Sequence, residues 1–203
     1  MFSPYKLAPI ESNFFEISSN LELAERLAAF FKDEKSQFLW NINTSRQRMA
    51  DALKHTCMVA LRQPMPPNPT TLKGTMDWNQ VMVISDTKIL SSYKIFQEMC
   101  QWLESTFIEA GSTKVEFGRI FFSKHMKNTK IGLHVDEGAY FDYYDRFHFV
   151  IEQTDHKNIF HIRNDPIELL TGNLYWVNNH VPHWLDNQSD TDRINLIIDA
   201  RLT

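Results

Sequence analysis

The fold of this chain is decided by the stretch Val115-Glu116-Phe117-Gly118-Arg119-Ile120-Phe121-Phe122-Ser123 and by the similar runs that follow it. These runs are short, β-prone and separated by segments rich in turn residues. They cover residues 115–123, 131–136, 146–153, 159–163, 173–178 and 193–202. Many short strands with regular turns are typical of a sandwich or jelly roll. We therefore predict a double-stranded β-helix, a cupin-like jelly roll, for the C-terminal half.

The residues before this half mix helix and strand signals. Ser19-Asn20-Leu21-Glu22 has the pattern of a capping box, and the apolar residues behind it are spaced as on one helix face. Residues 87–110 predict a second helix, which ends at Gly111. Residues 57–62 predict a strand, and the prolines between 64 and 69 predict a loop.

Helices first and strands later predict an α+β fold. The length of 203 residues favours one domain over 1–203. Within it, we expect a helix-rich N-terminal part over 1–114, packed outside a jelly-roll core over 115–203.

The bulk composition is ordinary for a globular protein, with 43% hydrophobic and 23% charged residues. A formal charge of −4 gives no general attraction to nucleic acid or anionic lipid, so neither partner is expected. Cys57 and Cys100 do not suggest a disulfide framework, which favours a reducing compartment. No signal-peptide pattern and no apolar run of about 18 residues is present, so we expect a cytoplasmic protein without a membrane span. The sequence does not indicate the oligomeric state.

Two histidines and one carboxylate have the order expected of an iron site. His134-Val135-Asp136 lies in the predicted strand 131–136, where residues i and i+2 project to the same face. His183 follows Asp136 by 47 residues, just before the last strand, and Arg193 follows ten residues later. Two neutral imidazoles and one carboxylate can occupy one face of an octahedron around Fe(II) and leave three positions open. We predict that His134, Asp136 and His183 bind metal.

Simpler readings compete with this interpretation. An isolated His-x-Asp is common by chance, and its side chains are usually exposed polar groups or make a local hydrogen bond. His180 lies in the same segment as His183 and is an alternative ligand. His125 follows a strand and is expected to be exposed.

The residues from about 115 to 203 resemble the aspartyl/asparaginyl β-hydroxylase-like branch of the Fe(II)/2-oxoglutarate dioxygenases. The matching elements are Gly118-Arg119-Ile120-Phe121-Phe122-Ser123, His134-Val135-Asp136-Glu137-Gly138, Arg146-Phe147-His148, Gly172-Asn173-Leu174-Tyr175-Trp176, His183 and residues 187–199. A weaker match covers residues 55–62. This branch includes bacterial proline cis-hydroxylases, and the Arg-x-His strand and Gly-x-x-Tyr-Trp are at least as similar to those.

The resemblance implies a set of roles. Fe(II) would be bound by the three predicted ligands, and Arg193 would pair with the C5 carboxylate of 2-oxoglutarate, where a planar guanidinium suits bidentate binding. Ser123, Arg146 and His148 would line the co-substrate pocket, and O₂ would be the second co-substrate. From the residues alone, Arg146 could instead pair with Asp142 or Asp145 on the surface, His148 could be an interior histidine and Ser123 an ordinary strand-end hydroxyl.

The implied activity is hydroxylation of a C–H bond in an amino acid or a peptidyl residue (Asp, Asn or Pro-like), with succinate and CO₂ as the other products. Arg62 and residues 64–70 lie where this family builds its substrate side. The alternative, from a different class, is a non-catalytic cupin-like protein that binds a small ligand or a metal.

Overall fold

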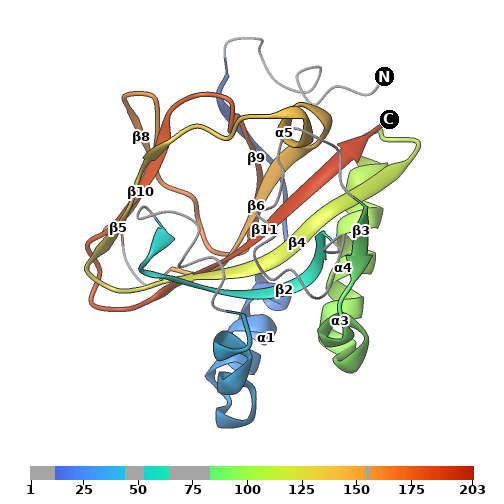
Figure 1. The fold of residues 1–203 in the computed structure, drawn as a ribbon, viewed down its shortest axis with the longest axis horizontal. Coiled ribbons are helices and arrows are strands. Elements are labelled where there is room, and N and C mark those ends of the chain that lie inside the picture. The colour runs from blue at the N-terminus through green and yellow to red at the C-terminus, as the bar shows by residue number, and fades with distance from the viewer. Residues whose placement is uncertain (1–11, 44–52, 65–82, 154–155) are drawn as a thin grey trace, which may run out of the picture.

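The structure, a computed structural model, describes residues 12–43, 53–64, 83–153 and 156–203 (Figure 1). Two antiparallel sheets form a jelly roll. The larger sheet runs in the order β1 (Phe14–Ser19), β9 (Asn173–Val177), β6 (Asp145–Glu152), β11 (Arg193–Leu202), β4 (Val115–His125), β2 (Thr56–Pro64) and β3 (Ile84–Asp86). The smaller sheet runs in the order β5 (Thr129–His134), β10 (His183–Asn187), β7 (Asn158–Ile162) and β8 (Asp165–Ile167). The prediction of an α+β fold with a jelly-roll core is confirmed.

Strand β11 lies in the middle of the larger sheet, and its two faces differ in chemistry. Ile194, Leu196 and Ile198 join the large apolar core. The alternate residues point to the other face, because successive side chains of a strand project in opposite directions. Those residues include Arg193, Asn195 and Asp199, all of them nearly fully buried. The sheet therefore has an apolar face and a face with buried polar groups.

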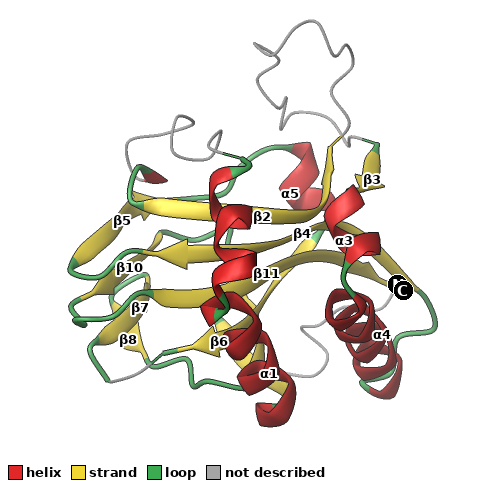
Figure 2. Cartoon of the chain, turned by 90° about the horizontal axis from the view of Figure 1, so that it is seen from below, coloured by secondary structure: helices red, strands yellow, loops and turns green. Residues whose placement is uncertain are grey.

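Helices α1 (Leu21–Lys32) and α4 (Lys94–Glu109) cover the apolar face of the larger sheet (Figures 1 and 2). Phe31 of α1 packs on Phe122 of β4, with ring centroids 4.7 Å apart, and Phe96 of α4 packs on the same ring at 5.2 Å. Burial of aromatic side chains stabilises this layer. The smaller sheet lies across the opposite face, so the polar groups are enclosed between the two sheets.

Two local predictions about the helices need correction. The capping box at Ser19 is wrong: strand β1 runs through Ser19, and the N-cap of α1 is Asn20, whose Oδ1 accepts from the Leu23 N–H at 3.0 Å. The predicted helix 87–110 is divided into α3 (Lys88–Ser92) and α4, because Tyr93 has an extended backbone. The stop at Gly111 agrees with its φ of +102°, which favours glycine.

The segment before residue 115 gives more than helices to the fold. It supplies η2 (Glu34–Asn41) and also three strands, β1, β2 and β3, that belong to the larger sheet. Strands β1, β3, β8 and β10 were not predicted. Pro64, predicted to begin a loop, is the last residue of β2, and the rest of the predicted loop and substrate-side segment, residues 65–70, lies outside the described residues. Within the described residues, no helix is both long and apolar enough to cross a membrane.

Candidate metal and co-substrate site

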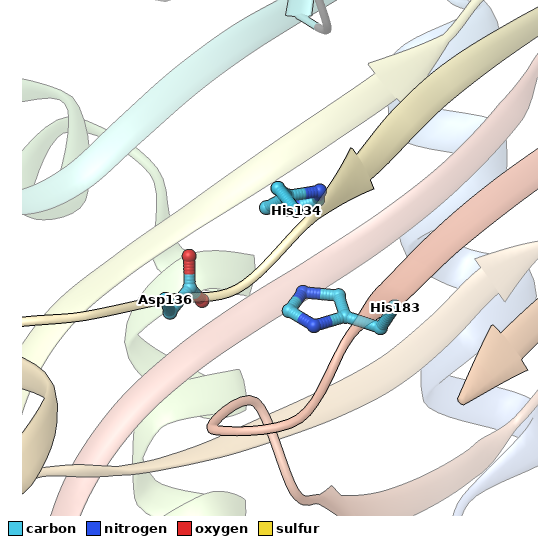
Figure 3. Close-up of side chains that lie close together, drawn as sticks. All are labelled: His134, Asp136 and His183. Carbon is cyan, nitrogen blue, oxygen red and sulfur yellow. The ribbon is translucent and has the colours of Figure 1, made fainter. Parts of the chain in front are cut away.

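The two predicted histidine ligands lie side by side on neighbouring strands of the smaller sheet. His134 is the last residue of β5, His183 is the first residue of β10, and the two are register partners. Their ring centroids lie 4.3 Å apart. Possible ligand atoms of His134, Asp136 and His183 all lie within 4.8 Å of one another, and the three side chains point toward a common centre (Figure 3). The structure therefore brings together the three residues that the sequence predicted.

The hydrogen bonds of the two rings leave the same nitrogen available on each. His134 Nδ1 lies 2.8 Å from the Gly132 carbonyl oxygen, and His183 Nδ1 lies 2.9 Å from the Val181 carbonyl oxygen. A carbonyl oxygen only accepts, so each Nδ1 carries the proton and each Nε2 offers a lone pair. Burial, and then His134, lower the pKa of His183 to about 4. The neutral imidazole needed for metal binding is therefore favoured at neutral pH.

Asp136 is held by the loop that precedes β10 and by an arginine. Its backbone N–H donates to the Asn179 carbonyl at 3.0 Å, and its Oδ2 accepts from Asn179 Nδ2 at 3.2 Å and from Arg146 Nη1. Burial raises the pKa of the carboxyl group, but Arg146, His183 and His134 outweigh it and lower the pKa to about 2. The group is thus ionised, and Oδ1 is the oxygen available to a metal.

The position of Asp136 corrects the sequence argument. Strand β5 ends at His134, two residues earlier than predicted, so Asp136 does not share a strand face with it. His183 precedes the last strand, as predicted, but it is itself the first residue of β10, a strand that was not predicted. The convergence of the ligands comes from strand pairing for the histidines and from loop contacts for the carboxylate. His180, the alternative ligand, has a side chain 41% exposed that lies 3.9 Å from Asp142, and it is not part of the cluster.

A cavity extends inward from the two histidines between the sheets. Its polar lining includes Ser123, His125, His148, Asn195 and Arg193, on strands β4, β6 and β11 of the larger sheet. The expectation that His125 is exposed is wrong: it is 2% exposed, because β4 continues through it. The cavity therefore combines the two histidines with side chains that can donate hydrogen bonds to an anion.

Arg193 is a buried cation in the wall of this cavity. It is 3% exposed, and its Nε donates to Gln153 Oε1 at 3.1 Å. Its Nη2 is buried and has no partner within the described residues, where no carboxylate pairs with it. Burial alone lowers the pKa of Arg193, to about 10. A buried charge with no counterion is costly, so this arrangement fits a site completed by an anionic ligand.

His148 lines the same cavity as Arg193 and the two histidines of the cluster. Its Nδ1 is 2.8 Å from Asn195 Nδ2. Burial, followed by the charges of Arg146 and Arg193, lowers the pKa of His148 well below its usual value. The ring is therefore neutral, and with Asn195 donating to Nδ1 its Nε2 carries a proton. His148 is thus a neutral hydrogen-bond donor in the pocket.

Arg146 also lines the cavity, but its guanidinium group is bound to two carboxylates. They belong to Asp136 and to Asp199, not to the surface acids considered from the sequence. Arg62, a candidate for the substrate side, pairs with Asp86 at 2.6 Å across β2 and β3.

Sequence reasoning missed Asn195 and Asp199. A signal was present in β11, because Arg193, Asn195 and Asp199 are polar residues at even spacing within an apolar strand.

The jelly roll, the His-Asp-His cluster and the buried arginine together define the non-haem Fe(II)/2-oxoglutarate dioxygenase class. The sequence profile of the family described as Aspartyl/Asparaginyl beta-hydroxylase matches residues 35–202, and the chain belongs to this family. It is therefore an enzyme of the 2-oxoglutarate-dependent dioxygenase type. A search of curated protein sequences finds no match.

Two solved structures illustrate the shared fold. An oxidoreductase of the 2OG-Fe(II) oxygenase family from Burkholderia pseudomallei is 11% identical, with a TM-score of 0.61 over 97% of this chain and 88% of that chain. The viral collagen prolyl hydroxylase of Paramecium Bursaria Chlorella virus-1, solved as a 2OG complex, is 10% identical, with a TM-score of 0.50 over 96% of this chain and 98% of that chain. At these identities the likeness shows the fold alone.

Proposed function

We propose that this protein hydroxylates a C–H bond of an amino acid or a peptidyl residue of Asp, Asn or Pro type. The reaction would convert substrate, O₂ and 2-oxoglutarate into hydroxylated product, succinate and CO₂. The observation that carries the proposal is a His-Asp-His cluster whose two histidines line one cavity with Arg193, a buried arginine that pairs with no carboxylate of the described residues. A single domain over 1–203 and a cytoplasmic location stay predictions from the sequence.

Each side chain would have a separate task. His134, Asp136 and His183 would hold Fe(II), which together with 2-oxoglutarate supplies the oxidising chemistry. Arg193 would pair with the C5 carboxylate through its planar fork. His148 would donate from Nε2, and Ser123 would donate its hydroxyl to a carboxylate oxygen. Phe160 and Ile197 line the cavity and would exclude water from the reacting groups.

The residues around the cluster fit a metal ion. Both imidazoles are fixed through Nδ1 and are free at Nε2, and Asp136 is ionised. Neutral imidazole nitrogen and carboxylate oxygen are the ligands of the facial arrangement in Fe(II) oxygenases. Oriented ligands of this kind are expected at a metal centre.

The test is turnover. Metal-free protein would be loaded with Fe(II) and 2-oxoglutarate without oxygen, given an O₂ pulse, and assayed for succinate with free amino acids and with Asp-, Asn- or Pro-containing peptides. We expect succinate with a preferred substrate and a product heavier by one oxygen atom. Bound iron without succinate above a no-enzyme control would support the alternative, a cupin-like binding protein.

A further inference from the structure

The carboxylate ligand lies on a loop, whereas the two histidines lie on strands. Asp136 is two residues beyond the end of β5, and Gly138, which follows closely, has a φ of +112°. The pleat of a strand therefore does not fix the direction of this side chain. Because a carboxylate can bind metal through one oxygen or two, other contacts must select its orientation.

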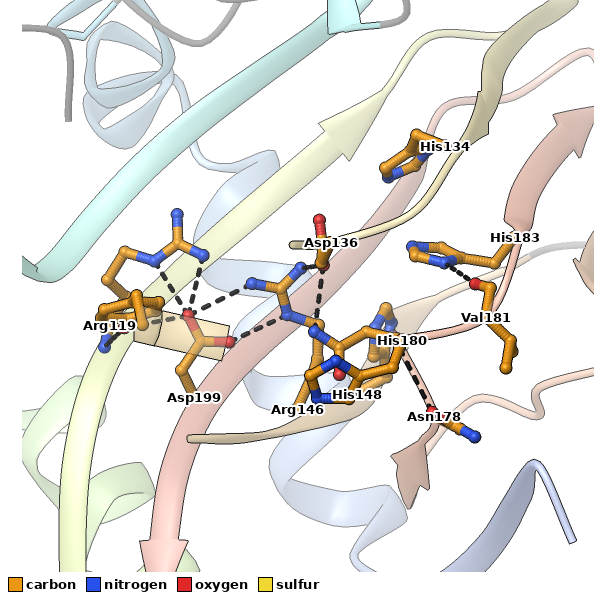
Figure 4. A network of polar contacts seen from close by, with 12 residues as sticks. Arg119, His134, Asp136, Arg146, His148, Asn178, His180, Val181, His183 and Asp199 are labelled. Atoms are coloured by element: carbon orange, nitrogen blue, oxygen red, sulfur yellow. Dashed lines mark hydrogen bonds and ion pairs between the residues drawn. The ribbon is translucent and has the colours of Figure 1, made fainter. Parts of the chain in front are cut away.

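Arg146 connects this loop to the rigid centre of the larger sheet. It lies on β6 directly opposite Asp199 of β11. Its Nε donates to Asp199 Oδ1 at 2.8 Å, and its Nη2 donates to Asp199 Oδ2 at 3.2 Å. Its remaining nitrogen, Nη1, donates to Asp136 Oδ2. The guanidinium group of Arg146 thus binds Asp199 through its Nε–Nη2 edge and binds Asp136 through Nη1 alone (Figure 4).

Asp199 is itself held from a second side. It is 1% exposed, and its Oδ2 accepts from Arg119 Nε at 2.8 Å and from the Tyr140 hydroxyl at 3.1 Å. Burial raises the pKa of the Asp199 carboxyl group, but Arg146 and Arg119 outweigh it and lower the pKa. Two arginines and two carboxylates therefore form a balanced buried network, which avoids an uncompensated charge.

The sheet is locally built to admit this network. Ile120 and Phe117 of β4 pair with Ile198 and Ala200 of β11, so Gly118 and Arg119 together oppose Asp199 in a β-bulge. A Cβ on Gly118 would lie 2.8 Å from the Tyr140 hydroxyl oxygen. Only glycine leaves room for the Tyr140 hydroxyl group, which donates to Asp199 Oδ2.

We propose that Asp199 is a positioning residue for the metal site. By occupying the Nε–Nη2 edge of Arg146, it leaves a single nitrogen for Asp136, so Asp136 Oδ1 stays available to the metal. Without that carboxylate, the fork of Arg146 can turn to both oxygens of Asp136 and compete with the metal, since bidentate pairing is favourable. The inference rests on the proposed function, because it requires Asp136 to be a metal ligand.

The test measures metal binding by the metal-free full chain, using Mn(II) affinity and the Co(II) absorption spectrum. Asp199→Asn keeps the shape of the side chain and removes its charge. We expect Mn(II) affinity to fall by about 10-fold, the lower end of the range for direct partners of metal ligands, because Asp199 acts through Arg146, and we expect the Co(II) spectrum to change. Glu116→Gln is the matched control, because Glu116 accepts from Tyr143 and Tyr144 and has no link to Asp136. Its Mn(II) affinity should stay within about twofold of wild type.

A second comparison separates positioning from general damage to the fold. In an Arg146→Met background, which keeps all three proposed metal ligands, Asp199→Asn should change Co(II) affinity by less than about twofold, because the side chain through which Asp199 acts is gone. If Asp199→Asn does not fold, Arg146→Lys tests the same bridge, since one ammonium group cannot contact both carboxylates in this way. Wild-type affinity and an unchanged Co(II) spectrum in the folded variant would overturn the inference. Failure of the wild-type protein to bind either metal would instead overturn the proposed function.

Discussion

Arg193 donates through Nε to Gln153 Oε1 at 3.1 Å, so the hydrogen-bond partner of this buried cation is a neutral amide. Burial lowers the pKa of Arg193 to about 10, and no acidic group among the described residues opposes this. Within that part of the chain no carboxylate pairs with the charge, so an anionic ligand would supply its counterion. This relationship links the stability of the protein to the binding of its co-substrate.

Arg193→Met should abolish the stabilisation of the protein by 2-oxoglutarate while metal binding is retained. Loss of one partner of a buried charge pair costs about 2–5 kcal/mol in binding. In the absence of ligand the same variant should be at least as stable as wild type, because an unpaired buried charge is removed. Thermal denaturation with and without Mn(II) and 2-oxoglutarate measures both effects.

The control for that variant is Arg201→Met. Arg201 lies at the other end of β11, with its guanidinium carbon 4.2 Å from the centre of the Tyr143 ring. Its loss should leave the 2-oxoglutarate response unchanged. An undiminished 2-oxoglutarate response in Arg193→Met would place the carboxylate anchor elsewhere in the cavity.

Removing either histidine of the cluster should eliminate specific metal binding. His134→Ala and His183→Ala each delete one of three ligands, and little core packing is lost at His134, which is not fully buried. His180→Ala serves as the control, because His180 is outside the cluster. Mn(II) titration followed by electron paramagnetic resonance distinguishes the three variants. If His180→Ala lost Mn(II) binding and His183→Ala kept it, His180 and not His183 would be the metal ligand.

Metal-free protein should lose stability as the pH falls from about 6.5 toward 4. Burial, with His134, lowers the pKa of His183 to about 4 in the folded state, whereas the unfolded chain has a value near 6.5. Between these values the unfolded state binds more protons, so the free energy of unfolding rises with pH across this window. The shift corresponds to about 3 kcal/mol.

Denaturant unfolding of the metal-free protein across this pH range measures the dependence. His148 has a pKa shifted in the same direction and contributes to the same slope. His183→Asn should therefore reduce the slope without removing it. An unchanged slope in that variant would show that His183 does not titrate as described.

Gly118→Ala should destabilise the protein by about 1–3 kcal/mol, the usual cost of overpacking. The added Cβ would meet the Tyr140 hydroxyl oxygen at 2.8 Å and the Asp199 carbonyl oxygen at 3.1 Å. A second change, Tyr140→Phe, removes the nearest of these atoms. The double variant should recover part of the lost stability in denaturant unfolding, and no recovery would mean that the clash lies elsewhere.

The sequence predicted much of the fold, because strand-forming runs and helical periodicity are local signals. It also predicted that His134, Asp136 and His183 come together, and the structure places their possible ligand atoms within 4.8 Å of one another; that they bind metal stays a prediction. It failed where tertiary pairing decides the structure. Strand β10 is only His183–Asn187 and includes Asp186 and Asn187, residue types that favour turns, so it gave no strand signal.

The contacts of Asp136 show the same limit. Its carboxylate is oriented by Asn179 and Arg146, which are distant in sequence from each other, and Arg146 in turn depends on Asp199. No periodicity links these residues. The even spacing of polar residues along β11 was the one local signal of the network, and it becomes meaningful only once the strand is known to lie at the centre of the sheet.

The central claim is that the cluster and Arg193 form one working co-substrate site. Its most direct test is succinate formation after an O₂ pulse to protein loaded with Fe(II) and 2-oxoglutarate, compared between wild type, His134→Ala and Arg193→Met. We expect succinate from wild type, faster with the right amino acid or peptide, and none above the no-enzyme control from His134→Ala. Arg193→Met should form succinate only at much higher 2-oxoglutarate concentrations. Equal succinate formation by all three proteins, or none from iron-loaded wild type with any substrate, would contradict the account.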